Sequence, residues 1–286
     1  MKIRTVAVIG GGAMGRQIAM NTAIYPFEVY LTDTNPDVLK SVEEWKEEYL
    51  AGRIAKGRMT EEQVAGIKSR FHLVNSLEET VKNADLVIEA VVEINEIKRE
   101  IFRKLGEIAR PDAILTTNSS YIVSSEFADV VPNPSRLCNL HYFNPALVMK
   151  LTEVVKGEHT SEETIRAMCD FSIATGKSPA VVKKEISGFI VNRVLSAIYK
   201  EVRTLVDEGY CSYEDVDIAC EKGLGHPMGP YRLNDLTGID LTYDILKKVY
   251  DTTGQKPEGF DLIKELYDKG WYGTKTGRGF YDYTRK

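Results

Sequence analysis

Short apolar runs alternate with longer amphipathic segments along the first part of the chain. The apolar runs are rich in β-branched residues and cover residues 3–9, 28–32, 71–74, 85–91 and 113–117. The intervening segments carry helix-start signals, such as Pro36 after Asn35 and the capping pattern Thr60–Gln63. Strands that alternate with helices pair in parallel, so this pattern predicts a doubly wound, mostly parallel α/β sheet.

Beyond residue 188 the strand pattern stops. The last strand before it is expected at residues 180–182, after a helix that Thr160 begins and Gly176 ends. Further helices are then predicted at residues 189–208, 213–222, 239–250 and 260–269. The first of these is apolar almost all round, which predicts that it is buried. We therefore expect two domains, a sheet domain at residues 1–187 and an all-α domain at residues 188–286.

Composition narrows the possible function classes. The chain has 286 residues, enough for two domains, and its net charge of −5 creates no field that attracts nucleic acid or an anionic membrane. No apolar stretch approaches the ~18 residues of a transmembrane helix, and nothing resembles a signal peptide. The four cysteines show no C-x-x-C spacing, and no cluster has the spacing of metal ligands. We expect a cytoplasmic protein without a metal site, a nucleic-acid partner or a membrane partner.

The first apolar run leads into a nucleotide-binding fingerprint. Gly10, Gly12 and Gly15 form the pattern G-x-G-x-x-G between this strand and the next helix. Glycine permits a tight turn, close approach of the backbone to a pyrophosphate, and close packing of helix on strand. The phosphates would lie at the positive end of the helix, where Ala13 and Met14 begin it. This context predicts a Rossmann-like dinucleotide-binding domain.

Asp33 indicates which dinucleotide is bound. It follows the second apolar run, about 20 residues beyond the last glycine, where a carboxylate accepts both ribose hydroxyls of NAD. A carboxylate there would also repel a 2′-phosphate, and Thr34 and Asn35 bring no arginine to neutralise one. The sequence therefore predicts NAD rather than NADP.

A histidine and a glutamate form the candidate catalytic pair. His141 follows an apolar run at residues 137–140, and Glu153 lies in the next run, at residues 149–155. If these runs are neighbouring strands, the imidazole and the carboxylate meet as a proton acceptor and its orienting partner. A single histidine at a strand end is more often structural, so the prediction depends on the NAD fingerprint. The ends of the predicted strands bring one composite site together: Gly10, Asp33, Val91, Ser119 and His141.

Asn192 is the unusual polar residue on the helix that is predicted to be buried. A buried amide needs hydrogen-bond partners, and neighbouring backbone groups could supply them. Its position four residues after Gly188, where the two domains join, would instead direct it at the crevice. Both roles stay open from the residues alone.

Together these residues resemble the L-3-hydroxyacyl-CoA dehydrogenase family, and closely its short bacterial 3-hydroxybutyryl-CoA branch. The resemblance covers essentially the whole chain. Besides the glycine fingerprint and Asp33, it rests on the motifs Asp85–Ala90, Ser119-Ser120, His141–Pro145, Lys150–Val155, Gly188–Arg193, His226–Pro230 and Lys275–Tyr281. It implies an NAD-dependent enzyme of fatty acid or butyrate metabolism that interconverts a short (3S)-3-hydroxyacyl-CoA and its 3-oxoacyl-CoA. It also implies a homodimer formed through the helical domain.

The same resemblance implies roles for individual residues. His141 removes the 3-hydroxyl proton and returns it in the reverse direction, while Glu153 fixes the tautomer of the imidazole. Ser119 and Asn192 hydrogen-bond the substrate oxygens, and Ser119 also borders the cofactor. Four further positions lie near the nicotinamide end of NAD: Glu93, Lys98, Asn144 and Lys275. Arg53 and Lys56 would meet the phosphates of CoA, although a solvated helix face explains these two equally well.

Departures from the family pattern leave the acyl chain length open. The usual Asn-Thr-Ser-Ser is Thr117–Ser120 here, the usual Glu-Asn pair is spread over Glu93–Asn95, and Tyr121 replaces a common leucine. Two other functions stay open. One is a CoA-free hydroxy-acid dehydrogenase of the same fold, of the gulonate or carnitine type. The other is a non-catalytic NAD-binding protein resembling a lens crystallin, which would have no need of the four catalytic positions.

Overall fold

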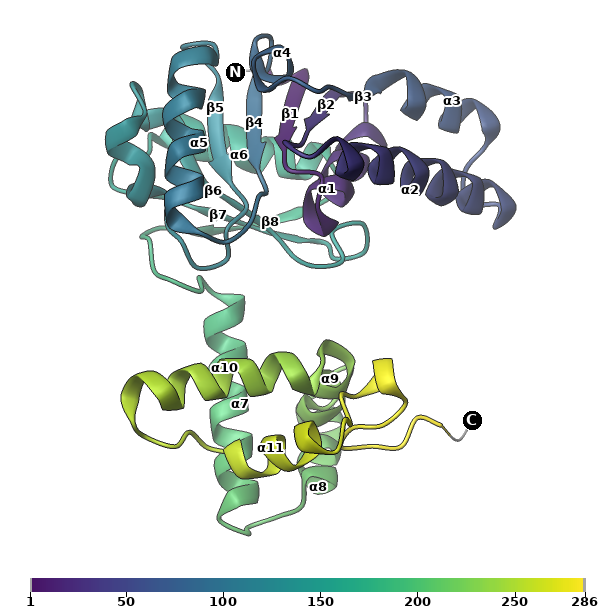
Figure 1. Ribbon diagram of the computed structural model, residues 1–286, viewed down its shortest axis with the longest axis vertical. Helices are drawn as coiled ribbons and strands as arrows, with labels where there is room; N and C mark the ends of the chain where they lie inside the picture. The colour runs from purple at the N-terminus through teal and green to yellow at the C-terminus, as the bar shows by residue number, and fades with distance from the viewer. Residues whose placement is uncertain (1, 285–286) are drawn as a thin grey trace. The chain divides into compact units, whose positions relative to one another are not determined.

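The chain divides after Ile190 into two compact units. A computed structural model describes residues 2–284, with a sheet and its helices in the first unit and a helical second unit (Figure 1). The sequence argument placed the boundary slightly earlier, between Ser187 and Gly188. Within the described residues, no helix is long and apolar enough to cross a membrane.

The first unit is built on one eight-stranded sheet with the order β3-β2-β1-β4-β5-β6-β7-β8. Neighbouring strands are parallel, except that β6 and β7 are antiparallel. The bounds are β1 Thr5–Ile9, β2 Glu28–Thr32, β3 Phe71–Leu73, β4 Leu86–Glu89, β5 Ile114–Thr117, β6 Leu137–Tyr142, β7 Leu151–Val155 and β8 Ser178–Val182. The predicted doubly wound, mostly parallel sheet is therefore confirmed. Its strand order reverses between β1 and β4, and such a switch point opens a ligand crevice at the carboxyl ends of the strands.

Helices cover both faces of the sheet (Figure 1). Their bounds are α1 Ala13–Ala23, α2 Pro36–Ala55, α3 Glu61–Arg70, α4 Leu77–Val81, α5 Asn95–Ile108, α6 Glu162–Ala174, and the 3-10 helices η1 Ser124–Val130 and η2 Pro134–Arg136. Side chains of α1, α2, α3 and α6 pack on one face, and those of α4, α5 and η1 pack on the other. Because alternate residues of a strand point to opposite faces, β1 contributes Val6 and Val8 to one core and Ala7 and Ile9 to the other.

Two of the predicted helix starts have the expected local bonds. The Asn35 side chain accepts a hydrogen bond from the Asp37 N–H at 2.9 Å, with Pro36 at the first helical position. Thr60 and Gln63 exchange both hydrogen bonds of a capping box. These side chains satisfy N–H groups that a helix leaves unpaired in its first turn.

The second unit packs its helices around an apolar core of its own. Its elements are α7 Val191–Asp207, α8 Tyr213–Ile218, a π-helical turn η3 Ala219–Gly223, α9 Pro230–Thr237, α10 Ile239–Thr253, α11 Phe260–Asp268 and the 3-10 turn η4 Thr274–Thr276. Tyr231, Ile239 and Ile263 are among the buried residues of this core. The sequence argument predicted no helix between residues 222 and 239 and therefore missed α9.

A buried carboxylate joins the C-terminal segment to α9. Asp235 accepts hydrogen bonds from the backbone N–H groups of Phe280 at 2.9 Å and Tyr281 at 3.0 Å. It also accepts one from the hydroxyl of Tyr283 at 3.0 Å. Burial raises the pKa of Asp235 above its ordinary value. The motif Lys275–Tyr281 therefore has a structural function in this unit, whatever else it does.

The prediction that the helix after Gly188 is buried is wrong. Among the residues of α7 only Val202 is fully buried, and Val194 is 54% exposed. The reason lies in the polar residues that the sequence argument gave too little weight: Arg193, Lys200, Glu201 and Arg203 interrupt the apolar positions, so the helix is amphipathic.

Candidate active site

The catalytic pair proposed from the sequence meets across two strands. His141 and Glu153 are directly paired in the antiparallel ladder of β6 and β7, so their side chains leave the same face of the sheet. The Nδ1 atom of His141 lies 2.9 Å from Oε2 of Glu153, and the two side chains are 5% and 0% exposed. Two strands that the sequence left as a conditional pair are therefore neighbours, and the ladder register sets this contact.

This geometry defines the proton positions on the imidazole. A carboxylate only accepts, so Nδ1 carries the hydrogen in the bond to Glu153 and Nε2 of the neutral ring keeps a lone pair. Nε2 lies 3.0 Å from the hydroxyl oxygen of Ser120. Phe143 and Phe189 pack edge-on against the ring, with centroids 4.6 Å and 5.5 Å away. The outer nitrogen can therefore exchange a proton while the ring is held in place.

Glu153 is fixed by a second contact as well. Its Oε1 atom accepts a hydrogen bond from the backbone N–H of Ile190 at 3.0 Å. With one oxygen bound to His141 and the other to this N–H, the carboxylate has a defined orientation. A buried carboxylate held in this way stabilises an imidazolium when His141 takes up a proton.

The two neighbouring serines have different surroundings. Ser119 is buried, its hydroxyl donates to a carboxylate oxygen of Glu93, and its oxygen accepts the Ile122 N–H at 2.8 Å. Ser120, rather than Ser119, is the serine whose hydroxyl reaches His141. The sequence argument selected Ser119 for contact with the substrate. The choice between adjacent serines depends on the backbone turn after β5, and the sequence carried no signal for it.

The glycine fingerprint forms the turn that the sequence predicted. Gly10 has a φ of 104°, and a Cβ atom there would lie 2.7 Å from the carbonyl oxygen of Ala90. A Cβ on Gly15 would lie 1.8 Å from the carbonyl oxygen of Gly10. A Cβ on Gly12 would instead project into open space just before α1 begins at Ala13. Gly10 and Gly15 are thus needed for close packing, and Gly12 leaves room for a ligand at the helix N-terminus.

A pocket of about 430 Å³ opens beside this turn. Its lining includes Gly10, Gly12 and Asp33 on one side and Val91 and Ile101 on the other. The carboxylate of Asp33 accepts the Gly11 N–H at 2.8 Å and the Asn35 N–H at 2.9 Å. Apolar walls, open space at Gly12 and a fixed carboxylate fit the adenosine and pyrophosphate of a dinucleotide. Gly10, Gly12, Ala13, Met14, Gly15 and Asp33 are the residues that would hold it.

Two further expected cofactor residues lie in a polar network at the ends of β4 and β5. The ammonium group of Lys98 is 2.7 Å from Glu89 and 3.4 Å from Glu93. Lys98 and Glu89 are almost completely buried, whereas the side chain of Glu93 is 43% exposed. Glu89 was part of a motif in the sequence but received no role there.

A buried lysine holds the loop that follows the catalytic strand. Lys177 donates hydrogen bonds to the backbone carbonyls of Ala146 and Met149, the latter at 2.8 Å. Burial, with a smaller effect from Lys150, lowers the pKa of Lys177 to about 8. Asn144, expected beside the nicotinamide, begins this loop and is exposed. The sequence argument gave Lys177 no role.

Other predicted site residues belong to α2 or to the second unit. Arg53 lies near the C-terminal end of α2 and lines a hollow of about 510 Å³ with Arg58 and Arg70, and the exposed Lys56 caps the same helix. Asn192 and Lys275 belong to the second unit. Asn192 is half-buried in the first turn of α7, and Lys275 forms an ion pair with Asp240.

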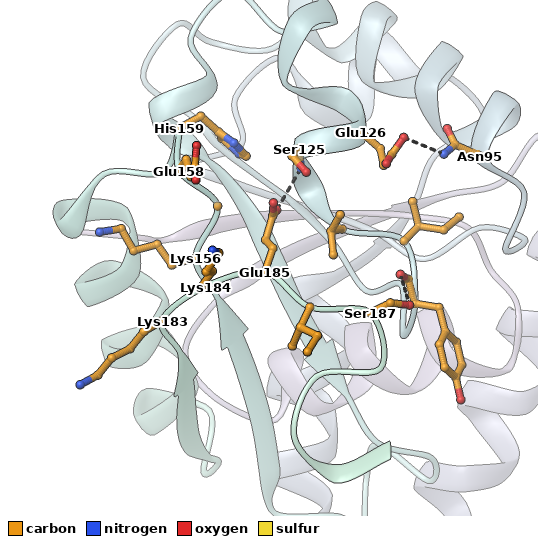
Figure 2. A pocket seen from close by; sticks show the side chains of 15 residues that line it. Asn95, Ser125, Glu126, Lys156, Glu158, His159, Lys183, Lys184, Glu185 and Ser187 are labelled. Carbon is orange, nitrogen blue, oxygen red and sulfur yellow. Dashed lines mark hydrogen bonds between the residues drawn. The ribbon is translucent and has the colours of Figure 1, made fainter. Parts of the chain in front are cut away.

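A further pocket of the sheet unit was not predicted. It measures about 910 Å³ and lies between the residues after β5, β7 and β8 (Figure 2). Glu185 accepts hydrogen bonds from the Ser124 hydroxyl at 2.8 Å and the Ser125 N–H at 2.9 Å, which connects two of the walls. The lining carries three lysines and three glutamates, so its charge selects no class of ligand. The described residues contain no group of three or more histidines, cysteines or acids that could hold a metal ion.

Family models for the two domains of one enzyme family match the two units of this chain. The family model for the NAD-binding domain of 3-hydroxyacyl-CoA dehydrogenase matches residues 5–186. The model for the C-terminal domain of 3-hydroxyacyl-CoA dehydrogenase matches residues 188–283.

Individual relatives match over the full chain. A probable 3-hydroxybutyryl-CoA dehydrogenase of Bacillus subtilis is 37% identical over 100% of this chain and 99% of its own length. The crystal structure of a 3-hydroxybutyryl-CoA dehydrogenase from Escherichia coli is 36% identical with a TM-score of 0.89, and the match covers 100% of this chain and 61% of that one. The structure of a diketoreductase that acts on dicarbonyl compounds has a TM-score of 0.89 at 31% identity. The match covers 99% of this chain and 100% of that one.

Proposed function

This chain belongs to the 3-hydroxyacyl-CoA dehydrogenase family, with NAD as the cofactor, and on that premise we propose that it interconverts (3S)-3-hydroxybutyryl-CoA and acetoacetyl-CoA. The observation that carries the proposal is the His141–Glu153 pair, whose outer nitrogen faces a serine hydroxyl at the carboxyl end of the strands. A short acyl chain is favoured by the full-length similarity to proteins named for the hydroxybutyryl substrate.

His141 handles the proton in the proposed reaction. Its Nε2 lone pair accepts the proton of the 3-hydroxyl group as the C3–H bond breaks and a C3=O double bond forms. Bound NAD supplies the acceptor for the hydride that leaves C3. Glu153 stabilises the imidazolium through Nδ1, and the reverse reaction returns the same proton to the 3-oxo oxygen. Imidazole suits both directions because its reference pKa of about 6.5 lies near neutrality.

We assign Ser120 to the oxygen on C3. Its hydroxyl lies 3.0 Å from Nε2 of His141, so an oxygen that accepts a hydrogen bond from Ser120 would also be within reach of the imidazole. Ser119 is assigned to the turn and to Glu93, because its hydroxyl is engaged there. Asn192 is proposed, from the family resemblance, to donate to a second substrate oxygen, and Asn144 and Lys275 to border the nicotinamide end of the cofactor.

The CoA part of the substrate is assigned to the α2–α3 region. Arg53, Arg58 and Arg70 line one hollow there, and Lys56 is exposed beside it. Guanidinium groups bind phosphate oxygens in pairs and are suited to the phosphates of CoA. The chain as a whole is acidic, so a polyanionic ligand needs a local basic region of this kind.

A second candidate is reduction of a CoA-free dicarbonyl or hydroxy acid. The observation in its favour is the structural similarity to a diketoreductase over nearly the whole chain. The same His141–Glu153 pair would handle the proton, but the basic region at α2 and α3 would have no ligand.

We also propose a homodimer. On α10, Leu241, Ile245 and Val249 are 54%, 52% and 41% exposed and follow each other at one helical turn. Val194 of α7 is exposed as well. Apolar stripes of this kind are typical of surfaces that a partner covers, and a second copy of the chain is the partner that the family resemblance implies. Sedimentation of the wild type and of a Leu241→Glu, Ile245→Glu variant would test it, because the variant is expected to be monomeric.

The function is tested by the absorbance of NADH during reduction of several substrates. We expect acetoacetyl-CoA to be reduced at least 100-fold more efficiently, in kcat/KM, than free acetoacetate or a diketone. NADH is expected to be preferred over NADPH because of Asp33. Efficient reduction of CoA-free substrates with no turnover of acetoacetyl-CoA would select the second candidate, and NADH binding without any turnover would indicate the non-catalytic reading.

A further inference from the structure

Five polar residues at the carboxyl ends of β4 and β5 and in α5 form a closed ring of contacts, in which Ser119 takes part through both its side chain and its backbone N–H. The ring runs from Glu89 to Lys98, Glu93, Ser119 and Thr117 and back to Glu89. Four of its members are almost completely buried, and Glu93 is the exception. The ring lies where the sheet opens its ligand crevice, so its geometry determines which groups a ligand meets there.

The Glu89 side chain accepts three hydrogen bonds. Its Oε1 atom accepts from the Lys98 ammonium at 2.7 Å and from the Val91 N–H at 2.7 Å. Its Oε2 atom accepts from the Thr117 hydroxyl at 2.7 Å. The residue is 0% exposed. Three donors thus hold the buried carboxylate in one orientation, and it forms a buried ion pair with Lys98.

Through Thr117 and Lys98, the ring fixes two groups that border the crevice, the turn at Ser119 and the side chain of Glu93. The Thr117 oxygen that donates to Glu89 accepts the Ser119 N–H at 3.1 Å, which fixes the turn before Ser120. The Lys98 ammonium is 3.4 Å from Glu93, the one ring carboxylate with exposed surface. Glu89 itself has no exposed atom to offer a ligand, so any effect on binding must pass through these neighbours.

We propose that Glu89 is a positioning residue for the nicotinamide half of the cofactor site. It holds the Lys98 ammonium and the Thr117 hydroxyl in place, and thereby fixes Glu93 and the Ser119 turn before a ligand arrives. The proposal rests on the proposed function and on the family resemblance, which implies that Glu93 and Lys98 border that half of NAD. The adenosine half is formed separately by Gly12 and Asp33 at the ends of β1 and β2, so the two halves can be tested independently.

The test uses Glu89→Gln, which keeps the size of the side chain and removes its charge. The dissociation constant of NADH is measured by its fluorescence, and ADP, which lacks the nicotinamide and its ribose, is measured as a competitor of NADH. We expect NADH to bind at least 10-fold more weakly, with the constant for ADP within twofold of the wild type. Glu96→Gln is the matched control, because Glu96 is an exposed acid on the same helix α5. It should change neither constant.

Two results would overturn the proposal. Equal weakening of NADH and ADP would show a general loss of structure, and unchanged NADH binding would show that Glu89 does not position this half. If Glu89→Gln does not fold, Thr117→Val removes one arm of the ring and keeps the charge pair. This variant is expected to raise the dissociation constant of NADH about threefold and to leave that of ADP unchanged. Unchanged NADH binding in this variant would also reject the proposal. A wild type that binds NADH without reducing acetoacetyl-CoA would reject the proposed substrate and leave this comparison intact.

Discussion

Glu153 of the sheet unit and Asp235 of the helical unit are both 0% exposed. Each accepts hydrogen bonds from groups that are distant in the sequence. Glu153 binds the His141 imidazole and a backbone N–H, whereas Asp235 binds two backbone N–H groups and a tyrosine hydroxyl of the C-terminal segment. The burial and the bonding are alike, but only Glu153 has an imidazole as its partner, a side chain that can both accept and donate a proton. What a buried carboxylate does is therefore decided by its partner and by the access of that partner to a ligand.

Replacement of His141, the partner of Glu153, should have the largest effect on activity. We expect His141→Gln to reduce kcat for acetoacetyl-CoA reduction by about 10³-fold or more, because no other group takes up the proton. The NADH dissociation constant should stay within twofold of the wild type. Initial rates and NADH fluorescence measure the two quantities. A variant with near wild-type turnover would remove His141 from the mechanism.

Removal of the structural carboxylate should lower stability without affecting NADH binding. Asp235→Ala leaves three donors of the C-terminal segment without their acceptor, and we expect the free energy of unfolding of the helical unit to fall by about 2 to 3 kcal/mol. Urea unfolding followed by far-UV circular dichroism measures it, with NADH affinity as the internal control. Loss of NADH binding at full stability would contradict the contrast between the two carboxylates.

Substitution of each neighbouring serine tests which hydroxyl contacts the reacting oxygen of the substrate. Ser120→Ala removes the hydroxyl beside His141 and is expected to reduce kcat by about 10- to 100-fold, in line with loss of one donor to a reacting oxygen. Ser119→Ala, the matched variant, should mainly raise the KM for NADH through Glu93. Steady-state kinetics with both substrates varied separates the effects. If Ser119→Ala lowered kcat and Ser120→Ala only raised the KM for NADH, Ser119 would be the serine that contacts the substrate.

The last prediction concerns pH and the loop held by Lys177. Its pKa is lowered to about 8 in the folded chain from an ordinary value of 10.5. Between these values the unfolded state binds more protons, so Lys177 makes the wild type more stable as pH rises from about 8 to 10.5. Lys177→Met should lose this increase. Urea unfolding at several pH values tests it, and parallel curves for the two proteins would show that the lysine is not perturbed.

The sequence allowed prediction of the parts of the fold that depend on residue patterns. Apolar runs identified the strands, and the spacing of Gly10, Gly15 and Asp33 identified the nucleotide-binding turn, because these features follow from local periodicity and backbone sterics. The β6–β7 neighbourhood was a conditional prediction, and the ladder register between His141 and Glu153 now supports it.

Other features depend on contacts between distant segments and were missed for that reason. The role of Glu89 requires knowing that β4, β5 and α5 meet at one edge, and the difference between Ser119 and Ser120 requires the shape of one turn. The exposure of α7 was predicted wrongly because apolar content alone does not show which side of a helix is covered. The assignments of Asn192, Lys275, Arg53 and Lys56 stay predictions, as do the dimer and the cytoplasmic location.

The direct pairing of His141 with Glu153 in the β6–β7 ladder also determines which insertions this protein tolerates. A shift of β7 by one residue would turn Glu153 to the opposite face of the sheet and leave the imidazole without its carboxylate. The connection between the two strands is itself held by Lys177 at Ala146 and Met149, so added residues there would have to preserve both contacts. Deletion of a single residue inside either strand separates the pair, even if every side chain named in the reaction is retained.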